Sequence, residues 1–223
     1  MALTKVIGSG VQGISNSSDA TAITIGSDEV VDFASNADFI DGRGIRLGAG
    51  NDFQLYHDGT DNHINVTGSQ TLNIQTSGNN AIVVDANGHI NKPLQSAFLA
   101  KLSTNQNNLT ADGSLITIQF DTEIFDQNAD FDTSNYTFTA PVTGKYHLST
   151  VIYSEQLDSA ANFTYVTIKT SNRNVFLILT PKFSADATYW YFSGSLLLDM
   201  DASDTCIITY TQGTGDSQTD INS

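Results

Sequence analysis

Oxygen-bearing side chains at alternate positions between residues 126 and 132 form the pattern in this sequence closest to a metal-binding loop. Carboxylate and amide oxygens spaced in this way can surround Ca²⁺, and they belong to Asp126, Asn128, Asp130 and Asp132. The twelve-residue calcium loop of helix–loop–helix proteins also needs glycine at its sixth position and glutamate at its twelfth. Phe131 and Thr137 stand there instead. The segment therefore favours a polar loop between strands, with Ca²⁺ as a weak candidate ligand and no other cofactor expected.

Four consecutive aromatic residues, Tyr189-Trp190-Tyr191-Phe192, are the second feature that could recognise a ligand. In a strand, successive side chains point to opposite faces. Tyr189 and Tyr191 should therefore share one face, and Trp190 and Phe192 the other. One face is expected to pack in the core and the other at a subunit contact. Stacking of Tyr189 and Tyr191 on a host receptor or glycan is the alternative interpretation.

No constellation in the sequence indicates catalysis. The four histidines, at positions 57, 63, 89 and 147, lack metal-ligand spacing, and no nucleophile elbow, phosphate loop or dinucleotide fingerprint occurs. Aspartates are abundant enough for carboxylate pairs to arise by chance, so they do not mark a glycosidase. The single cysteine, Cys206, excludes an intrachain disulfide and is read as a small buried hydrophobe because it lies in an apolar strand. The chain is predicted not to be an enzyme.

The charge of the chain limits its partners. The net charge is −15, with 24 acidic and 9 basic residues spread along the sequence. No basic face is available for nucleic acid, and an anionic membrane surface would repel the chain. No apolar run reaches the roughly 18 residues of a membrane span, and residues 1–10 do not have the pattern of a secretory signal. Neither nucleic-acid binding nor membrane insertion is expected.

Short alternating segments separated by turn residues occupy residues 41–92, where the apolar side chains recur in pairs two positions apart. The pairs are Ile45 and Leu47, Phe53 and Leu55, Ile64 and Val66, Leu72 and Ile74, and Ile82 and Val84. Strands this thin cannot enclose a core in one copy. The sequence therefore predicts a trimeric β-rich shaft over residues 41–92. A single-chain β-solenoid is the alternative, but no strict repeat length emerges. Residues 1–40 are weakly patterned and are interpreted as an N-terminal anchor.

Residues 93–223 contain denser apolar alternation, at spacings of roughly 10–15 residues with turns between them. Ile116, Ile118 and Phe120 alternate, for example, and so do Cys206 and Ile208. No segment shows helical periodicity. The predicted fold is all-β, with an antiparallel sandwich or jelly roll in this half.

Residues 131–146 contain Phe138-Thr139-Ala140-Pro141, followed by Gly144-Lys145-Tyr146. Together with residues 96–102, 120–126 and 192–200 they resemble the C1q family. The resemblance implies a C1q/TNF-like jelly-roll head over residues 93–223, and some heads of this kind bind Ca²⁺ near a threefold axis. In that family a last strand with a Phe-Ser-Gly-Tyr-Leu type ending normally comes after this point, whereas this sequence stops at Asp220-Ile221-Asn222-Ser223. That strand is therefore expected to be missing or replaced by another segment.

Residues 51–59 contain Tyr56-His57-Asp58-Gly59, which resembles stretches in fibre and appendage proteins of marine bacteriophages, cyanophages especially. That resemblance implies homotrimers, attachment to other virion proteins through the N-terminal region, and a distal head for host attachment. The expected function is that of a virion structural protein, a tail fibre or another particle appendage, assembled in the host cytoplasm. A bacterial surface or secreted C1q-like adhesion module is the alternative, and a fibre-borne polysaccharide depolymerase is the third reading.

Overall fold

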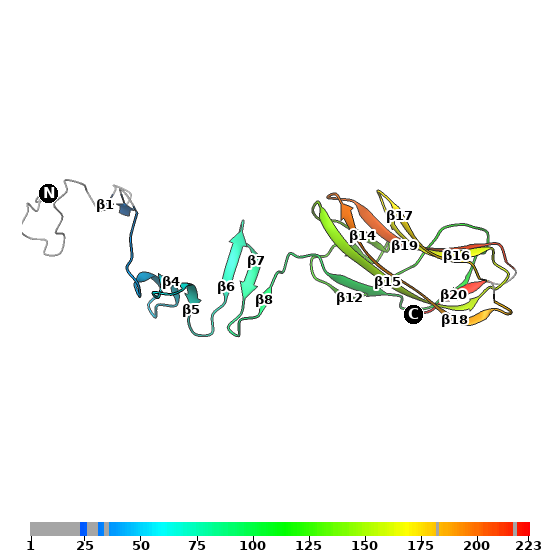
Figure 1. Cartoon of the computed structure of the whole chain (residues 1–223), viewed down its shortest axis with the longest axis horizontal. Coiled ribbons are helices and arrows are strands. Elements are labelled where there is room, and N and C mark those ends of the chain that lie inside the picture. Colours follow the sequence, from blue (N-terminus) through cyan, green and yellow to red (C-terminus); the bar gives the residue numbers. More distant parts are fainter. Residues whose placement is uncertain (1–22, 26–30, 34–35, 182, 216–217) are drawn as a thin grey trace, which may run out of the picture. The chain divides into compact units, whose positions relative to one another are not determined.

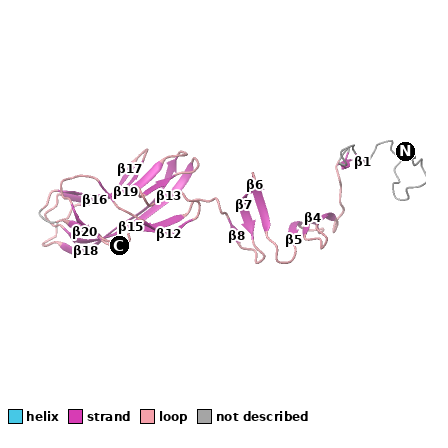
Figure 2. Cartoon of the chain, turned by 180° about the vertical axis from the view of Figure 1, so that it is seen from behind, coloured by secondary structure: helices cyan, strands magenta, loops and turns pink. Residues whose placement is uncertain are grey.

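The computed structural model describes residues 23–25, 31–33, 36–181, 183–215 and 218–223. Within these residues every regular element is a β-strand, and Figure 2 shows strands and loops without a helix. The all-β prediction is confirmed. The chain divides into two compact units, residues 1–71 and 72–223 (Figure 1). Most of the predicted anchor, residues 1–40, lies outside the described residues, although β1 (Ile23–Ile25) pairs with β2 (Val31–Phe33).

Two three-stranded antiparallel sheets follow one another along the chain. Every apolar pair predicted between residues 45 and 84 falls inside one of their strands. The first sheet is β3 (Gly44–Leu47), β4 (Phe53–His57) and β5 (Asn62–Val66). The second is β6 (Leu72–Thr76), β7 (Asn79–Val84) and β8 (Ile90–Asn91).

Strand register places most apolar side chains of each sheet on a single face, with Val83 on the other face of the second sheet. In the first sheet Ile45, Leu55 and Ile64 lie directly across from one another. Leu47, Phe53 and Val66 make a second row on the same face, because they are two residues along each strand. The second sheet repeats the arrangement with the rows Leu72, Val84, Ile90 and Ile74, Ile82. We call these two surfaces the apolar sheet faces.

Neither apolar sheet face is covered by the described part of the chain. None of residues 36–91 is buried, and the side chains of Leu47, Ile64 and Ile90 are 56%, 62% and 67% exposed. An isolated small sheet has no second layer on which to bury its apolar face. The two sheets therefore form without a hydrophobic core of their own.

The C-terminal part of the second unit is a jelly-roll sandwich of two antiparallel sheets. One sheet has the order β10 (Gln106–Leu109), β20 (Thr219–Ile221), β15 (Gly144–Leu157), β18 (Ala187–Met200). The other has the order β13 (Phe131–Asp132), β14 (Thr137–Thr139), β19 (Thr205–Gly213), β16 (Phe163–Thr170), β17 (Asn174–Leu179), with β11 (Ile116–Thr117) also paired to β19. A separate pair joins β9 (Phe98–Lys101) to β12 (Thr122–Asp126).

The core lies between the two sheets of the sandwich. One buried cluster is centred on Ile118, Ile152 and Tyr210, and a second on Phe138 and Ile168. Burying a side chain such as isoleucine stabilises the fold by about 1.5–3 kcal/mol. Cys206 belongs to the second cluster with 6% of its surface exposed, and burial raises the pKa of its thiol to about 12. The interpretation of Cys206 as a small buried hydrophobe is confirmed.

The last strand of the sandwich is short. Thr219–Ile221 forms β20 between β10 and β15, in the place where the resemblance led us to expect a missing or replaced strand. Its register pairs it with Ser154 and Glu155 of the fourteen-residue strand β15. Among the described residues, β20 therefore pairs with one end of β15.

Candidate interaction sites

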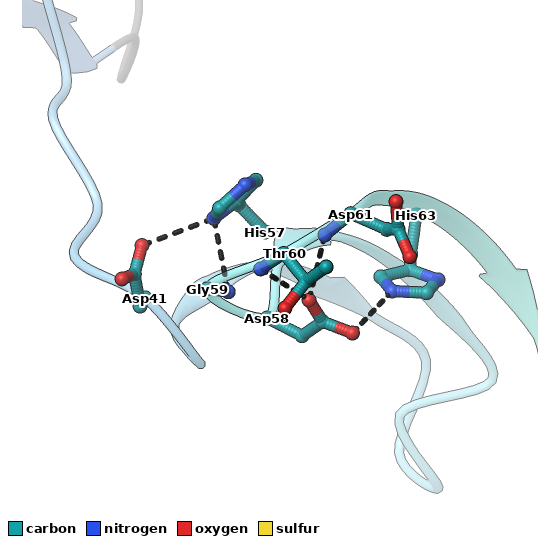
Figure 3. A network of polar contacts seen from close by, with 7 residues as sticks. All are labelled: Asp41, His57, Asp58, Gly59, Thr60, Asp61 and His63. Carbon is teal, nitrogen blue, oxygen red and sulfur yellow. Dashed lines mark hydrogen bonds and ion pairs between the residues drawn. The ribbon is translucent and has the colours of Figure 1, made fainter.

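A polar network closes the turn between β4 and β5 (Figure 3). The Asp58 carboxylate accepts the backbone N–H groups of Thr60 and Asp61, each at 2.8 Å, and lies 2.8 Å from Nε2 of His63. The N–H of Asp61, then the His63 side chain, hold the pKa of Asp58 well below its usual range. On its other side the His63 ring stacks on Tyr56, with centroids 4.7 Å apart. The Asp58 carboxylate thus holds the hairpin by hydrogen bonding to the turn backbone and to the His63 ring.

His57, at the end of β4, has two mutually exclusive partners in the same network. Its Nδ1 accepts the N–H of Gly59 at 3.0 Å and also lies 3.0 Å from Oδ1 of Asp41 (Figure 3). One ring nitrogen cannot accept the Gly59 N–H and donate to Asp41 at the same time. A ring with no hydrogen on Nδ1 suits Gly59, and a ring with a hydrogen on Nδ1 suits Asp41. Both contacts are exposed, and they serve to hold the turn.

The turn between β7 and β8 repeats this chemistry. Asp85 accepts the N–H groups of Asn87 and His89 at 2.8 and 2.9 Å, and its carboxylate lies 2.9 Å from Nδ1 of His89. Hydrogen bonds from the His89 side chain and backbone lower the pKa of Asp85. Each aspartate is followed by the triplet histidine, isoleucine, asparagine, at residues 63–65 and 89–91. Residues 44–91 therefore contain two versions of one three-stranded unit closed by an aspartate–histidine pair.

Sequence analysis missed this repeat because the two loops differ in length. The histidine follows the aspartate by five residues in the first unit and by four in the second. A search for a strict period cannot align them, although the shared His-Ile-Asn triplet was a usable signal.

The candidate calcium ligands run from the last residue of β12 through the loop into β13, and their carboxylates accept hydrogen bonds from nearby groups. Asp126 accepts the N–H of Phe131 at 2.8 Å. Asp130 accepts the amide of Asn128 at 3.0 and 3.1 Å and the hydroxyl of Ser96. Asp132 accepts the hydroxyl of Ser134 at 2.6 Å and its N–H at 2.8 Å, and these two bonds, in that order, lower the pKa of Asp132. The described residues contain no group of three or more His, Cys, Asp or Glu side chains that could hold a metal ion.

Tyr189 and Tyr191 lie on the outer face of the sheet, each 62% exposed, while Phe192 is buried and Trp190 packs against the core. The alternation predicted for this segment is therefore present. Tyr153 stacks on Tyr191 with ring centroids 4.9 Å apart. Partial burial, with the Glu155 carboxylate that accepts its hydroxyl at 2.9 Å, raises the pKa of Tyr153 to about 12.

Other exposed apolar side chains extend this surface along β15 and β18. By register and alternation they lie on the same side as the tyrosines. We call the surface formed by the following residues the tyrosine face: Val151, Tyr153, Tyr189, Tyr191 and Leu197.

A second aromatic surface covers the outer side of the opposite sheet. The ring of Tyr165 stacks on Phe163 at 5.5 Å and meets Phe176 edge to face at 5.3 Å. Ile178 lies across from Tyr165 in the register and is exposed. We call this surface the phenylalanine face. Sequence analysis did not single out this surface. Residues 175–179 are nevertheless apolar at every position, and such a pattern predicts a strand that is buried on both faces.

Comparison with known proteins identifies the sandwich. A family model described as "C1q domain" matches residues 97–223, which is more than half of the chain. Among solved structures, the globular domain of zebrafish complement 1qA protein is similar at 19% sequence identity and a TM-score of 0.39, covering 53% of this chain and 90% of that one. No curated protein matches the sequence. No helix among the described residues is long and apolar enough to cross a membrane.

Proposed function

Because the chain belongs to the C1q domain family, we propose that it is a homotrimeric structural protein of a virus particle, a tail fibre or another appendage. C1q domains typically form trimers and act as non-enzymatic structural or recognition modules. In this proposal residues 93–223 form the distal head, residues 41–92 the shaft, and residues 1–40 the anchor to other virion proteins. The Tyr56-His57-Asp58-Gly59 stretch, with its resemblance to bacteriophage fibre proteins, supports the assignment to a virion.

The observation that carries the proposal is the uncovered state of both apolar sheet faces. Residues 36–91 contain no buried side chain, yet their register gathers all the isoleucines and leucines of β3 to β8 on one side of each sheet. Exposed apolar area of this kind is removed from water when sheets pack face to face. Three copies set side by side would supply each sheet with partners of identical chemistry. A trimeric shaft provides such a shared core and matches the trimers that C1q domains typically form.

The head offers two unlike exposed surfaces through which neighbouring copies could meet. A closed ring of three copies needs two different surfaces on each copy, because every contact joins one surface to the other. The tyrosine face lies on the sheet of β15 and β18, and the phenylalanine face lies on the sheet of β16 and β17. We assign the contact between heads to these two faces, the tyrosine face of one copy against the phenylalanine face of the next. The loops at the ends of the sandwich are left to meet a host-cell surface or glycan.

Two measurements test the proposal at different levels. Light scattering of the full chain should give a mass of about 72 kDa, three times the chain mass of 23.9 kDa. A folded monomer at micromolar concentration would remove the basis of the shaft.

Mass spectrometry of purified virus particles from the source should detect the chain. An encoding gene placed among bacterial surface genes rather than capsid or tail genes would support the adhesion-module alternative, and release of reducing sugar ends from host polysaccharide would support the depolymerase.

A further inference from the structure

A closed cluster of polar side chains lies near the end of the sandwich where β15 and β19 finish. Asp158, Thr164, Tyr210, Gln212 and Thr219 belong to it, and each has 0% of its surface exposed. Polar residues are seldom enclosed so completely, and when they are, they need hydrogen-bond partners. Tyr210 and Gln212 lie on β19, whereas Thr219 lies on β20 of the other sheet. The cluster therefore connects the two layers of the sandwich.

The carboxamide of Gln212 is held in one orientation by its neighbours. Its Nε2 lies 3.3 Å from the Asp158 carboxylate and 3.4 Å from the carbonyl oxygen of Thr214. An ionised carboxylate and a backbone carbonyl can only accept hydrogen bonds, so the NH₂ end must face them. Oε1 of Gln212 accepts the hydroxyl of Thr219 at 2.8 Å and that of Tyr210 at 3.1 Å. Two hydroxyl groups thus converge on one carbonyl oxygen.

This arrangement combines a nucleophile, an electrophile and a donor that can stabilise negative charge. A hydroxyl 2.8 Å from the oxygen of a C=O bond lies roughly 3–4 Å from the carbon, since that bond is about 1.23 Å long. Reacting atoms in productive complexes stand about 3–3.5 Å apart. The Tyr210 hydroxyl bonds to Oε1 of Gln212, the atom that becomes negative when Thr219 adds to the carbonyl carbon. Burial raises the pKa of Tyr210 to about 12, so its hydroxyl keeps the proton that it donates.

We propose that Thr219 and Gln212 become joined by an ester bond that ties β20 to β19. Oγ1 of Thr219 attacks Cδ of Gln212, the Oγ1–Cδ bond forms, and the Cδ–Nε2 bond breaks. The nitrogen leaves as ammonia and takes with it the proton of the hydroxyl, so the reaction needs no further reactant. The Asp158 carboxylate is a positioning residue, because it holds Nε2 and thereby turns Oε1 toward the two hydroxyl groups.

The closed surroundings would preserve the ester once it has formed. Water is excluded from a site whose members are all buried, and water is the reactant that hydrolyses an ester. Gly215 lies so close that a Cβ at this position would collide with the Asp158 carboxylate, and its φ of +111° is one that L side chains rarely adopt. The link would join the two sheets covalently in a chain whose single cysteine allows no intrachain disulfide.

Mass spectrometry of the full chain tests the proposal. The linked chain should weigh about 17 Da less than its sequence requires, the mass of one ammonia molecule. Trypsin leaves residues 183–223 as a single peptide, because that stretch contains no lysine or arginine. Fragmentation of this peptide should give no ions from backbone cleavage between Gln212 and Thr219, since the ring holds the two pieces together. A peptide of full sequence mass after prolonged incubation, or an ammonia loss located elsewhere, would overturn the proposal.

Substitutions then separate the reacting hydroxyl from its neighbours. Thr219→Val keeps the shape of the side chain without the nucleophile and should retain the full mass, whereas Thr219→Ser should still be linked. Thr164→Val is the matched control and should be linked, because Thr164 is equally buried and lies directly across from Gln212 in the register. Tyr210→Phe lacks one donor to Oε1 and should form the link at least about tenfold more slowly. Loss of ammonia from Thr219→Val would reject Thr219 as the nucleophile, and the fragment map of the unchanged chain decides the question even if this variant fails to fold.

Discussion

Nε2 of His63 lies 2.8 Å from the Asp58 carboxylate across the turn that joins β4 and β5. The same carboxylate accepts two backbone N–H groups of the turn. One side chain therefore connects the loop backbone to the following strand. Because Asp85 and His89 repeat the arrangement between β7 and β8, this pairing is the local device that closes both three-stranded units.

Replacement of Asp58 should loosen the first of these hairpins. Asp58→Ala leaves the N–H groups of Thr60 and Asp61 without their acceptor and removes the partner of His63. Amide exchange over residues 53–66 should speed up, and limited proteolysis should cut within residues 58–62. Asp61→Ala is the matched control, since its backbone N–H remains. Equal proteolysis of the two variants would show that the Asp58 carboxylate does not hold the turn.

Acid should weaken the same turn. The pKa of Asp58 is depressed in the folded chain, so its contribution to stability is present above the unfolded value, about 3.9. That contribution is lost as the pH falls below this value toward the folded pKa. Protection of the turn amides, measured as exchange relative to the intrinsic rate at the same pH, should therefore fall below about pH 4 in the unchanged chain. Asp58→Asn should show a flatter pH profile, and a profile of the same steepness would contradict the assignment.

A charge placed on an apolar sheet face should break the shaft. Ile64→Asp introduces a carboxylate into the row formed with Ile45 and Leu55, whereas Asn65→Asp adds the same charge to the opposite face. If the apolar face is buried between copies, only Ile64→Asp should expose residues 44–66 to protease, because an unpaired buried charge is strongly destabilising. The comparison is made by limited proteolysis at equal protein concentration. Similar cleavage rates would indicate that this face is not an interface.

The lone cysteine should report on the integrity of the sandwich. Burial raises the pKa of Cys206 to about 12, so its reactive thiolate is scarce in the folded protein. Thiol reagents at pH 8 should modify it at least about a hundredfold faster in denaturant than in buffer. Because the folded pKa is raised, the associated stability is full below the unfolded value of about 8.5 and declines as the pH rises above it. Rapid labelling of the native chain would place Cys206 outside the core.

Period-two alternation was sufficient to place the strands between residues 44 and 84, since pairs such as Phe53 and Leu55 leave no other regular assignment. That Ile45, Leu55 and Ile64 lie directly across from one another could not be predicted, because strand register depends on the number of residues in each turn. The calcium reading of Asp126 rested on spacing alone, which does not show that its oxygen meets the N–H of Phe131. The phenylalanine face could not be predicted for a related reason. A continuous apolar run has the same sequence pattern whether its strand is covered by its own chain or by another chain.

The proposed pairing of unlike faces in the head predicts a specific outcome when two defective copies are mixed. Tyr191→Arg damages the tyrosine face and Phe176→Arg the phenylalanine face, and each should weaken the contact by about 2 kcal/mol or more, roughly thirtyfold. Val142→Arg is the control, because Val142 is exposed but lies on neither face. The test is made with Ile64→Asp and Ile82→Asp also present, so that the head alone must hold the copies together.

Either face variant alone should be monomeric by light scattering. In the mixture the intact tyrosine face of the Phe176→Arg copy can meet the intact phenylalanine face of the Tyr191→Arg copy, but the remaining two faces are both damaged. A pair of about 48 kDa should form and extend no further, twice the chain mass of 23.9 kDa. If like faces met instead, each variant would dimerise through its undamaged face before mixing. A dimer of Phe176→Arg alone would therefore reject the head-to-tail ring.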